Sequence, residues 1–196
     1  GKYHNNHTAF NENNGSGFSV NQLSVTHSQF LDMAGTIYAE GTPWNTTFNE
    51  AAGIFSVMKN RANAAGTSVL AQMSAPSQAF GYNDRDKINS IYAHPSSARN
   101  SRAAVIAGLT TSIDYSGGGF YWHGSDFART TTGSTAHENF YEVGFNFTNN
   151  SHDIWNLGNT SSGNAGWSYK YQSTGTGGNT TFMKLTDEWI KANNHQ

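Results

Sequence analysis

The sequence predicts an α+β fold that is mainly α-helical, with a short β-hairpin region in its C-terminal half. Helical spacing of apolar residues, with helix-start signals, occurs at 26–40, at 47–65 and from Pro95 onward. Residues 168–173 and 180–185 resemble two strands that flank a glycine-rich turn. A chain of 196 residues is long enough for one domain with a sizeable core.

The first helix is expected to begin near Thr26 and to end at Ala39 or Glu40, before Gly41. Thr26 and Gln29 match the capping box, in which each side chain bonds a free backbone N–H of the other residue. An apolar stripe runs along one face, at Phe30, Leu31, Ala34, Ile37 and Tyr38. We therefore expect this face to pack against the core.

The second helix is expected to run from Thr47 to Ala65 and to stop by Gly66. Thr47 and Glu50 again match a capping box, which gives Glu50 a structural role at the helix N-terminus. Glu50 is also close in sequence to Glu40, so a second carboxylate in a cleft is the alternative. The buried stripe is expected at Ala51, Ile54, Phe55 and Met58.

The middle of the chain is expected to contain a short helix or turn at Ser68–Met73 and then a loop over residues 77–84. Phe80 is expected to anchor this loop in the core. Groups that bind sugars are frequent in the loop, at Gln78, Tyr82, Asn83 and Asp84. Pro95 and Ser96 open a further helix, and its inner face is expected at Ala103, Ala104, Ile106, Ala107 and Leu109.

Three glycines at 117–119 allow close backbone approach and lead into a short expected strand at 120–122. One side of that strand should face the core, and the other is free to line a cleft. Residues 129–166 have no regular period and are expected to form an insertion, with a strand at Val143–Thr148.

The C-terminal region is expected to form a hairpin around a turn at 175–179, followed by a last helix from Thr186 to about Ala192. Trp189 and Ile190 should point inward from that helix.

At the other end of the chain, residues 1–22 are polar and rich in Asn and Gly, and we expect a flexible leader there. Two histidines in this leader, His4 and His7, are expected to be incidental. Residues 23–196 are expected to form a single domain. Gly1 in place of Met leads us to expect a processed or excised piece of a longer protein.

Composition excludes several classes of function. Charged residues are only 12% of the chain and the net charge is -2, which argues against nucleic acid as a partner. There are no cysteines, so disulfide scaffolds and thiolate metal sites are excluded. No apolar run approaches the roughly 20 residues of a membrane span. Aromatic residues at 13%, beside many Asn, Thr, Ser and Gly residues, favour a carbohydrate-handling surface or a protein with long polar loops.

Glu40 is the strongest catalytic candidate. It ends a helix whose apolar face is expected to be buried, beside small and aromatic residues. A carboxyl that is partly desolvated in such a place has a raised pKa, as a general acid at neutral pH requires. The alternative is a surface carboxylate, although the helix dipole disfavours an anion at a C-terminus.

Four segments in this order resemble the cell wall hydrolase SleB family, which includes the spore-cortex-lytic enzymes. They are Ile37–Glu40, Ala51–Arg61, Ser77–Phe80 and the stretch from Arg102 to Tyr121, and the resemblance covers roughly residues 27–127. The turn after Glu40 departs from the family because it is longer and lacks the usual Arg-Gly-Glu. The residues at 129–180 have no clear counterpart.

The resemblance implies a lysozyme-like helical core and a catalytic domain that cleaves the bond between N-acetylmuramic acid and N-acetylglucosamine in peptidoglycan. Glu40 would be the general acid/base, and no cofactor or metal is implied. In a lytic transglycosylase Glu40 suffices, whereas a muramidase would use a second carboxylate, Glu50 or Asp84. Substrate-binding candidates are Gln78, Tyr82, Asp84, Tyr121 and Trp122, with Trp44 and His123 as further cleft candidates.

The resemblance also implies a location outside the cytoplasm, either by secretion or by delivery to the periplasm of a target cell. Related lysozyme-like domains occur as antibacterial toxins of interbacterial secretion systems, including type VI effectors. An immunity or inhibitor protein is then a second expected partner. We expect a monomer, with neither nucleic acid nor membrane among its partners.

Two alternatives stay open. A non-catalytic glycan-binding module would use the same aromatic and Asn-rich loops without any need for Glu40. A metal-dependent amidase would use His123, His137 and His152, although no tight ligand spacing supports it.

Overall fold

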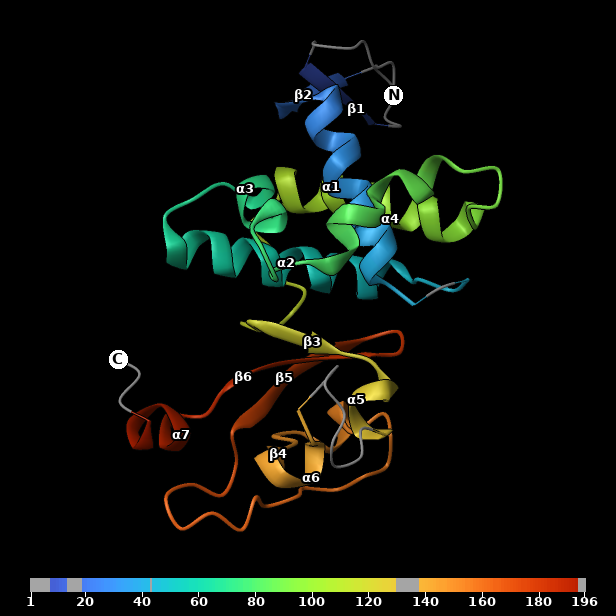
Figure 1. Cartoon of the computed structure of the whole chain (residues 1–196). Helices are drawn as coiled ribbons and strands as arrows, with labels where there is room; N and C mark the ends of the chain where they lie inside the picture. Colours follow the sequence, from blue (N-terminus) through green and yellow to red (C-terminus); the bar gives the residue numbers. More distant parts are fainter. Residues whose placement is uncertain (1–7, 14–18, 43, 130–137, 194–196) are drawn as a thin grey trace.

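Helices and a small sheet occupy opposite parts of the molecule in the computed structural model (Figure 1). The structure describes residues 8–13, 19–42, 44–129 and 138–193. The helical part contains α1 (His27–Glu40), α2 (Phe48–Ala65), α3 (Val69–Ser74), the 3-10 helix η1 (Phe80–Asn89) and α4 (Pro95–Thr110). Of these helices α2 lies nearest the sheet (Figure 1). The predicted α+β, mainly α class is confirmed.

The helix starts follow the capping signals of the sequence. Thr26 and Gln29 form the complete capping box of α1, with backbone-to-side-chain distances of 2.9 and 3.2 Å. The Thr47 hydroxyl accepts the Glu50 N–H at the start of α2, and Ser68 caps the short helix α3 in the same way. Gly66 ends α2 in the left-handed conformation that favours glycine. These side chains explain why the helix boundaries are predictable from the sequence.

The sheet has the strand order β3-β6-β5-β4, with all neighbours antiparallel except the parallel pair β4–β5. Its strands are β3 (Tyr121–His123), β4 (Phe145–Asn146), β5 (Tyr171–Gly177) and β6 (Thr180–Leu185). The remaining elements of this part are α5 (Ser125–Arg129), α6 (Phe140–Val143), the 3-10 helix η2 (Asn150–His152) and α7 (Asp187–Ala192). The predicted C-terminal hairpin is therefore β5–β6, and the predicted last helix is α7, capped by Thr186.

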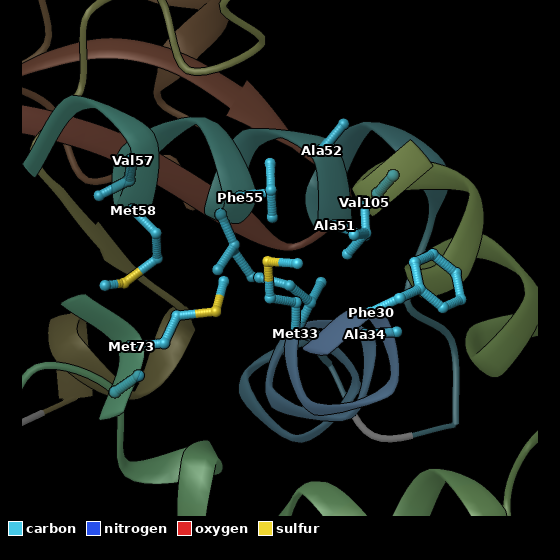
Figure 2. Close-up of a cluster of buried hydrophobic side chains, with 14 of the residues drawn as sticks. Phe30, Met33, Ala34, Ala51, Ala52, Phe55, Val57, Met58, Met73 and Val105 are labelled. Carbon is cyan, nitrogen blue, oxygen red and sulfur yellow. The ribbon is translucent and has the colours of Figure 1, made fainter. Parts of the chain in front are cut away.

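The main core lies between the helices. Figure 2 shows α1 presenting Phe30, Met33 and Ala34 toward Ala51 and Phe55 of α2. Met58, Met73 and Val105 complete this cluster from α2, α3 and α4. Each large side chain that is fully buried in this way stabilises the fold by about 1.5–3 kcal/mol. The predicted inner faces of the first two helices are the faces that pack.

A second, smaller core lies around the sheet and is dominated by the aromatic rings of Phe127, Phe140, Phe145, Phe147 and Tyr171, with Met183 among them. Strand β6 connects the two cores, because Phe182 packs in the helical core and its neighbour Met183 packs in the aromatic one. Successive strand residues point to opposite faces, so one strand serves both. Trp189 and Ile190 of α7 are half-buried, in part as predicted.

Two local predictions for residues 77–84 are wrong. Most of the expected loop is the first half of η1, and Phe80 is 79% exposed instead of anchoring the core. The chain instead approaches α1 at Gly81, where an added Cβ would lie 3.0 Å from Glu40 atoms and from the Ala39 Cβ. Only glycine fits this closely, and the side chain before it, Phe80, is exposed.

The predicted inner face of α4 is also largely wrong. Small residues are buried there, namely Ser97, Ala98, Ser101, Ala104, Val105 and Gly108, and of the predicted face only Ala104 is fully buried. The reason is close helix packing: an added Cβ on Gly108 would lie 2.2 Å from the Phe55 ring. The larger Ile106 and Leu109 lie half-buried at the sides of this contact.

Two further segments differ from the sequence predictions. The strand expected at Val143–Thr148 is only the two-residue β4, because α6 ends at Val143 and Gly144 has a positive φ. Within the expected leader, β1 (Thr8–Asn13) pairs antiparallel with β2 (Ser19–Thr26), so these residues form strands. His4 and His7 lie outside the described residues.

Candidate active site

A pocket of about 740 Å³ lies between the helical part and the sheet. Its walls come from the end of α1, from α2, from the segment before η1, from β3 and from the β5–β6 hairpin. Clefts of this size, with a few polar groups converging among aromatic rings, are typical of small-molecule and substrate sites.

Glu40 lies in this pocket at the last position of α1. Its Oε1 accepts a hydrogen bond from the Gly81 backbone N–H at 2.5 Å. Burial raises the pKa of Glu40, and the Gly81 hydrogen bond, the Arg61 charge and a hydrogen bond with the Trp122 side chain only partly offset it. Glu40 therefore keeps its proton to a higher pH than an ordinary glutamate. This is the property that the sequence predicts for it.

Arg61 of α2 organises the wall beside Glu40. Its Nε donates to the Phe120 carbonyl at 2.6 Å and its Nη1 donates to the Gln78 carbonyl at 3.1 Å. Its guanidinium carbon lies 5.1 Å from the ring centres of both Tyr121 and Trp122. The half-buried Arg61 guanidinium thus ties α2 to two other walls of the pocket. No role was predicted for Arg61 from the sequence, where it stands at the end of the segment Ala51–Arg61.

The structure brings together three of the five predicted substrate-binding residues. Gln78, Tyr121 and Trp122 line the pocket with Glu40. Tyr82 does not line it, because its ring packs against the helical core with the Arg85 guanidinium 4.3 Å above it. Asp84 does not line it either, and forms an exposed ion pair with Lys87 at 2.9 Å.

Glu50 lies at the wall of the pocket but is itself 0% exposed. Its Oε1 accepts hydrogen bonds from the Thr42 hydroxyl at 2.6 Å, the Thr180 hydroxyl at 2.7 Å and the Thr42 backbone N–H at 3.3 Å. The capping box predicted for α2 is therefore only half formed, because Thr47 caps Glu50 while the Glu50 side chain turns to these stronger donors. Glu50 joins the turn after α1 to the β5–β6 hairpin.

Beside Glu40 and Glu50, two further carboxylates line the pocket, Asp126 and Glu138, and neither was predicted from the sequence. Glu138 forms an ion pair with Lys170, and the Tyr171 hydroxyl donates to its Oε2 at 2.7 Å. Burial would raise the pKa of Glu138, but the hydrogen bonds from Lys170 and Tyr171 and the charges of Lys170 and His123 outweigh it and lower that pKa. Glu138 lies in the stretch at 129–166 that showed no sequence pattern, so no local signal marked it.

A second hollow of about 450 Å³ adjoins the pocket and shares Gly41 and Thr42 with it. Its lining includes Asp84 and two well-exposed rings, Trp44 at 73% and Tyr92 at 85%. Trp44 has a positive φ of 72°, a strained conformation for a bulky residue, and packs edge-on against His94. Trp44 therefore lies beside the pocket and not within it.

The histidines do not gather in the part of the chain that the structure describes. His123 lines the pocket and stacks on Phe127 with ring centres 4.1 Å apart. The Nδ1 of His152 lies 2.9 Å from the Ser173 hydroxyl, and His137 lies outside the described residues. Within the described ranges, no group of three or more His, Asp or Glu side chains is placed to bind a metal ion.

Comparisons with protein-family models, with curated proteins and with solved structures found no match to this chain. Among the described residues, no helix has the length and apolar character needed to span a membrane.

Proposed function

We propose that this chain cleaves the glycan strand of peptidoglycan, with Glu40 as the general acid. One observation carries the proposal: burial raises the pKa of Glu40, and Glu40 lies in a pocket lined by the rings of Tyr121 and Trp122. A general acid needs a raised pKa, and sugar faces stack on aromatic rings. The resemblance of residues 27–127 to the SleB family supplies the substrate class.

In this mechanism Glu40 gives its proton to the glycosidic oxygen as the bond to the anomeric carbon breaks, through an oxocarbenium-like transition state. The Gly81 N–H binds Oε1, and the Trp122 side chain also hydrogen-bonds the carboxyl group, so both hold it in place at the pocket wall. The Gln78 side chain is oriented by Gln72, whose Nε2 donates to its Oε1 at 2.7 Å, and presents its own N–H groups to sugar hydroxyls.

After Glu40 has donated its proton, the reaction can finish in two ways. A lytic transglycosylase would use the deprotonated Glu40 to activate a hydroxyl of the same muramic acid residue, leaving an anhydro sugar. A muramidase would add water and leave a reducing end. Asp84 is displaced from the pocket and Glu50 is bound on one oxygen by three donors, so neither takes the second-carboxylate role in our proposal.

Peptidoglycan lies outside the cytoplasmic membrane, so the proposal places the working protein there, whether secreted or delivered to a target cell as an antibacterial toxin. A producing cell would then need an inhibitor of this pocket, and an immunity protein is the proposed partner.

The test is mass analysis of the soluble products released from purified peptidoglycan. Wild type, Glu40→Gln and Asp86→Asn are compared, because Asp86 is an exposed carboxylate of η1 that lines neither hollow. We expect muropeptides with cleaved glycan bonds from the wild type and from Asp86→Asn, and none from Glu40→Gln.

Other outcomes separate the alternatives. An active Glu40→Gln protein would refute the role of Glu40. Binding to sacculi without soluble products would favour a glycan-binding module, and release of peptides that a chelator blocks would favour a metal-dependent amidase.

A further inference from the structure

We propose that Glu138, bound by Lys170 and Tyr171, is a second catalytic carboxylate that takes the proton of an attacking water, so that the reaction ends in hydrolysis. This inference rests on the proposed function, because it assigns the ending of the same reaction at the same site.

The first support is the position of Glu40 and Glu138 in the pocket. Glu40 and Glu138 line one pocket but come from different parts of the fold. Glu40 ends α1, on the helical side, whereas Glu138 comes two residues before α6, a helix that lies on the far side of the sheet from α2 in Figure 1. Two carboxylates on different walls are what an acid and a water-activating base need, since one acts on the leaving oxygen and the other on the opposite face of the sugar ring.

A chain of ring contacts connects the two carboxylates along the pocket wall. The Arg61 guanidinium beside Glu40 lies over Tyr121, and the Tyr121 ring lies 5.5 Å from the Tyr171 ring, edge to face. Tyr171 in turn donates its hydroxyl to Glu138. The intervening surface is therefore aromatic, and a sugar ring can lie on it with one carboxylate at each end.

The second support is the binding of the Glu138 carboxylate as an anion. Lys170 binds Oε1, and the Tyr171 hydroxyl binds Oε2. The Lys170 ammonium also lies 5.3 Å from the Tyr171 ring centre and 4.9 Å from that of Trp189, so rings fix its place. A carboxylate has about four acceptor sites on its two oxygens. Each oxygen thus keeps acceptor capacity for a water.

The protonation states agree with these roles. Glu40 has a raised pKa and Glu138 a lowered one, so at one pH the first is the acid and the second the anion. The charged and titratable groups acting on Glu138 are Lys170, which directly precedes β5, Tyr171 of β5 and His123 of β3. Burial and the bond to Glu138 raise the pKa of Tyr171, so the phenol stays a donor.

The proposed step balances without a co-reactant other than water. The glycosidic bond breaks and its electron pair goes to the leaving oxygen, which takes the Glu40 proton. Water forms the new bond to the anomeric carbon and loses one proton to Glu138. Net transfer of that proton back to Glu40 through solvent restores both groups. The product has a reducing end and differs by one water from an anhydro product.

The first experiment needs only the wild type, and it is mass analysis of its products. Reducing-end products are expected, and anhydro products would overturn the proposal even if Glu40 is essential. By contrast, an active Glu40→Gln protein, or no cleaved glycan at all, would refute the proposed function itself.

The second experiment substitutes the carboxylate. Glu138→Gln should lower the rate of reducing-end formation about 100-fold or more, as expected for loss of a general base. Folding is checked by circular dichroism, and Asp86→Asn is again the control. A folded Glu138→Gln protein within about twofold of the wild type would contradict the assignment.

A third measurement separates catalysis from a structural role. In Glu138→Ala, sodium azide should restore cleavage and yield a glycosyl azide, because azide attacks without needing a base. A folded variant that stays inactive with azide would assign Glu138 a structural role only.

Lys170→Met should move the acidic limb of the pH–rate profile to higher pH, since it removes the cation that lowers the pKa of Glu138. An unmoved limb would count against Glu138 as the base.

Discussion

Glu40 illustrates at the scale of one residue how much of the site the sequence predicts. The apolar stripe before it and Gly41 after it indicate a buried helix end, and in the structure Glu40 is half-buried, which raises its pKa. What the sequence does not reveal is the donor opposite it, the Gly81 N–H, which comes from a segment that was expected to be a loop.

Arg61 and Glu138 show why the other site residues were missed. The role of Arg61 depends on carbonyl groups of Gln78 and Phe120, far from it in sequence. The state of Glu138 depends on Lys170 and Tyr171, more than thirty residues away. Charge and hydrogen-bond partners of this kind follow from the fold and leave no local pattern. The predictions for Tyr82 and Asp84 were wrong for the converse reason. Their side chains have suitable chemistry for sugar binding, but they contact Arg85 and Lys87 and do not line the pocket.

Glu40→Gln should be at least as stable as the wild type at neutral pH. The folded pKa of Glu40 lies above its unfolded value, so the folded state binds more protons and wild-type stability falls as pH rises through that window. Glutamine has no charge to desolvate and still accepts the Gly81 hydrogen bond. Thermal unfolding at about pH 4 and about pH 8 should show the advantage of the variant growing with pH. A Tm for the variant below that of the wild type at the higher pH would contradict this account.

At the scale of elements, helices with capping side chains were predictable, and so were the short strand β3 and the β5–β6 hairpin, whereas β4 and η1 were not. Thr26, Thr47, Ser68 and Thr186 mark helix starts that the structure confirms. The two-residue β4 and the 3-10 helix η1 have no comparable markers. The inner face of α4 was misassigned because only apolar residues were chosen, whereas the buried face includes Ser97, Ser101 and Gly108, which allow close contact with Phe55 and its neighbours.

Gly53→Ala should destabilise the protein by about 1–3 kcal/mol because the contact between α2 and β6 leaves no room. An added Cβ at Gly53 would lie 2.0 Å from the Phe182 ring. Helix propensity alone favours alanine over glycine by about 1 kcal/mol. The sign of the change in the free energy of unfolding therefore shows whether the clash with Phe182 or the helix propensity is the larger effect. Denaturant unfolding measures it, and adding Phe182→Leu should recover part of the loss. A more stable single variant would mean that α2 and β6 are more widely spaced than described.

At the scale of the whole molecule, the pocket exists because two cores meet, and its walls belong to both. A glycan strand is longer than one pocket, and the second hollow continues from Gly41 and Thr42 toward Trp44 and Tyr92. In the proposed function this hollow takes further sugars of the same strand.

Trp44→Ala should therefore raise KM for long glycan strands about fivefold, the equivalent of about 1 kcal/mol of ring contact. Short soluble fragments that fill only the Glu40 pocket should be cleaved at the wild-type rate. Ile91→Ala is the matched control, because Ile91 is 90% exposed nearby but lines neither hollow. Equal effects on long and short substrates would argue that Trp44 supports the turn after Glu40 and not the strand.

Strand β6 places Phe182 in one core and the adjacent Met183 in the other. Neither core can loosen without shifting the backbone that the other depends on, so melting of one should propagate to the other. In a calorimeter the chain should then show a single peak, with a van't Hoff enthalpy equal to the calorimetric one. The catalytic cleft would be lost in that same transition, and heat inactivation would follow global unfolding with no earlier, partial loss.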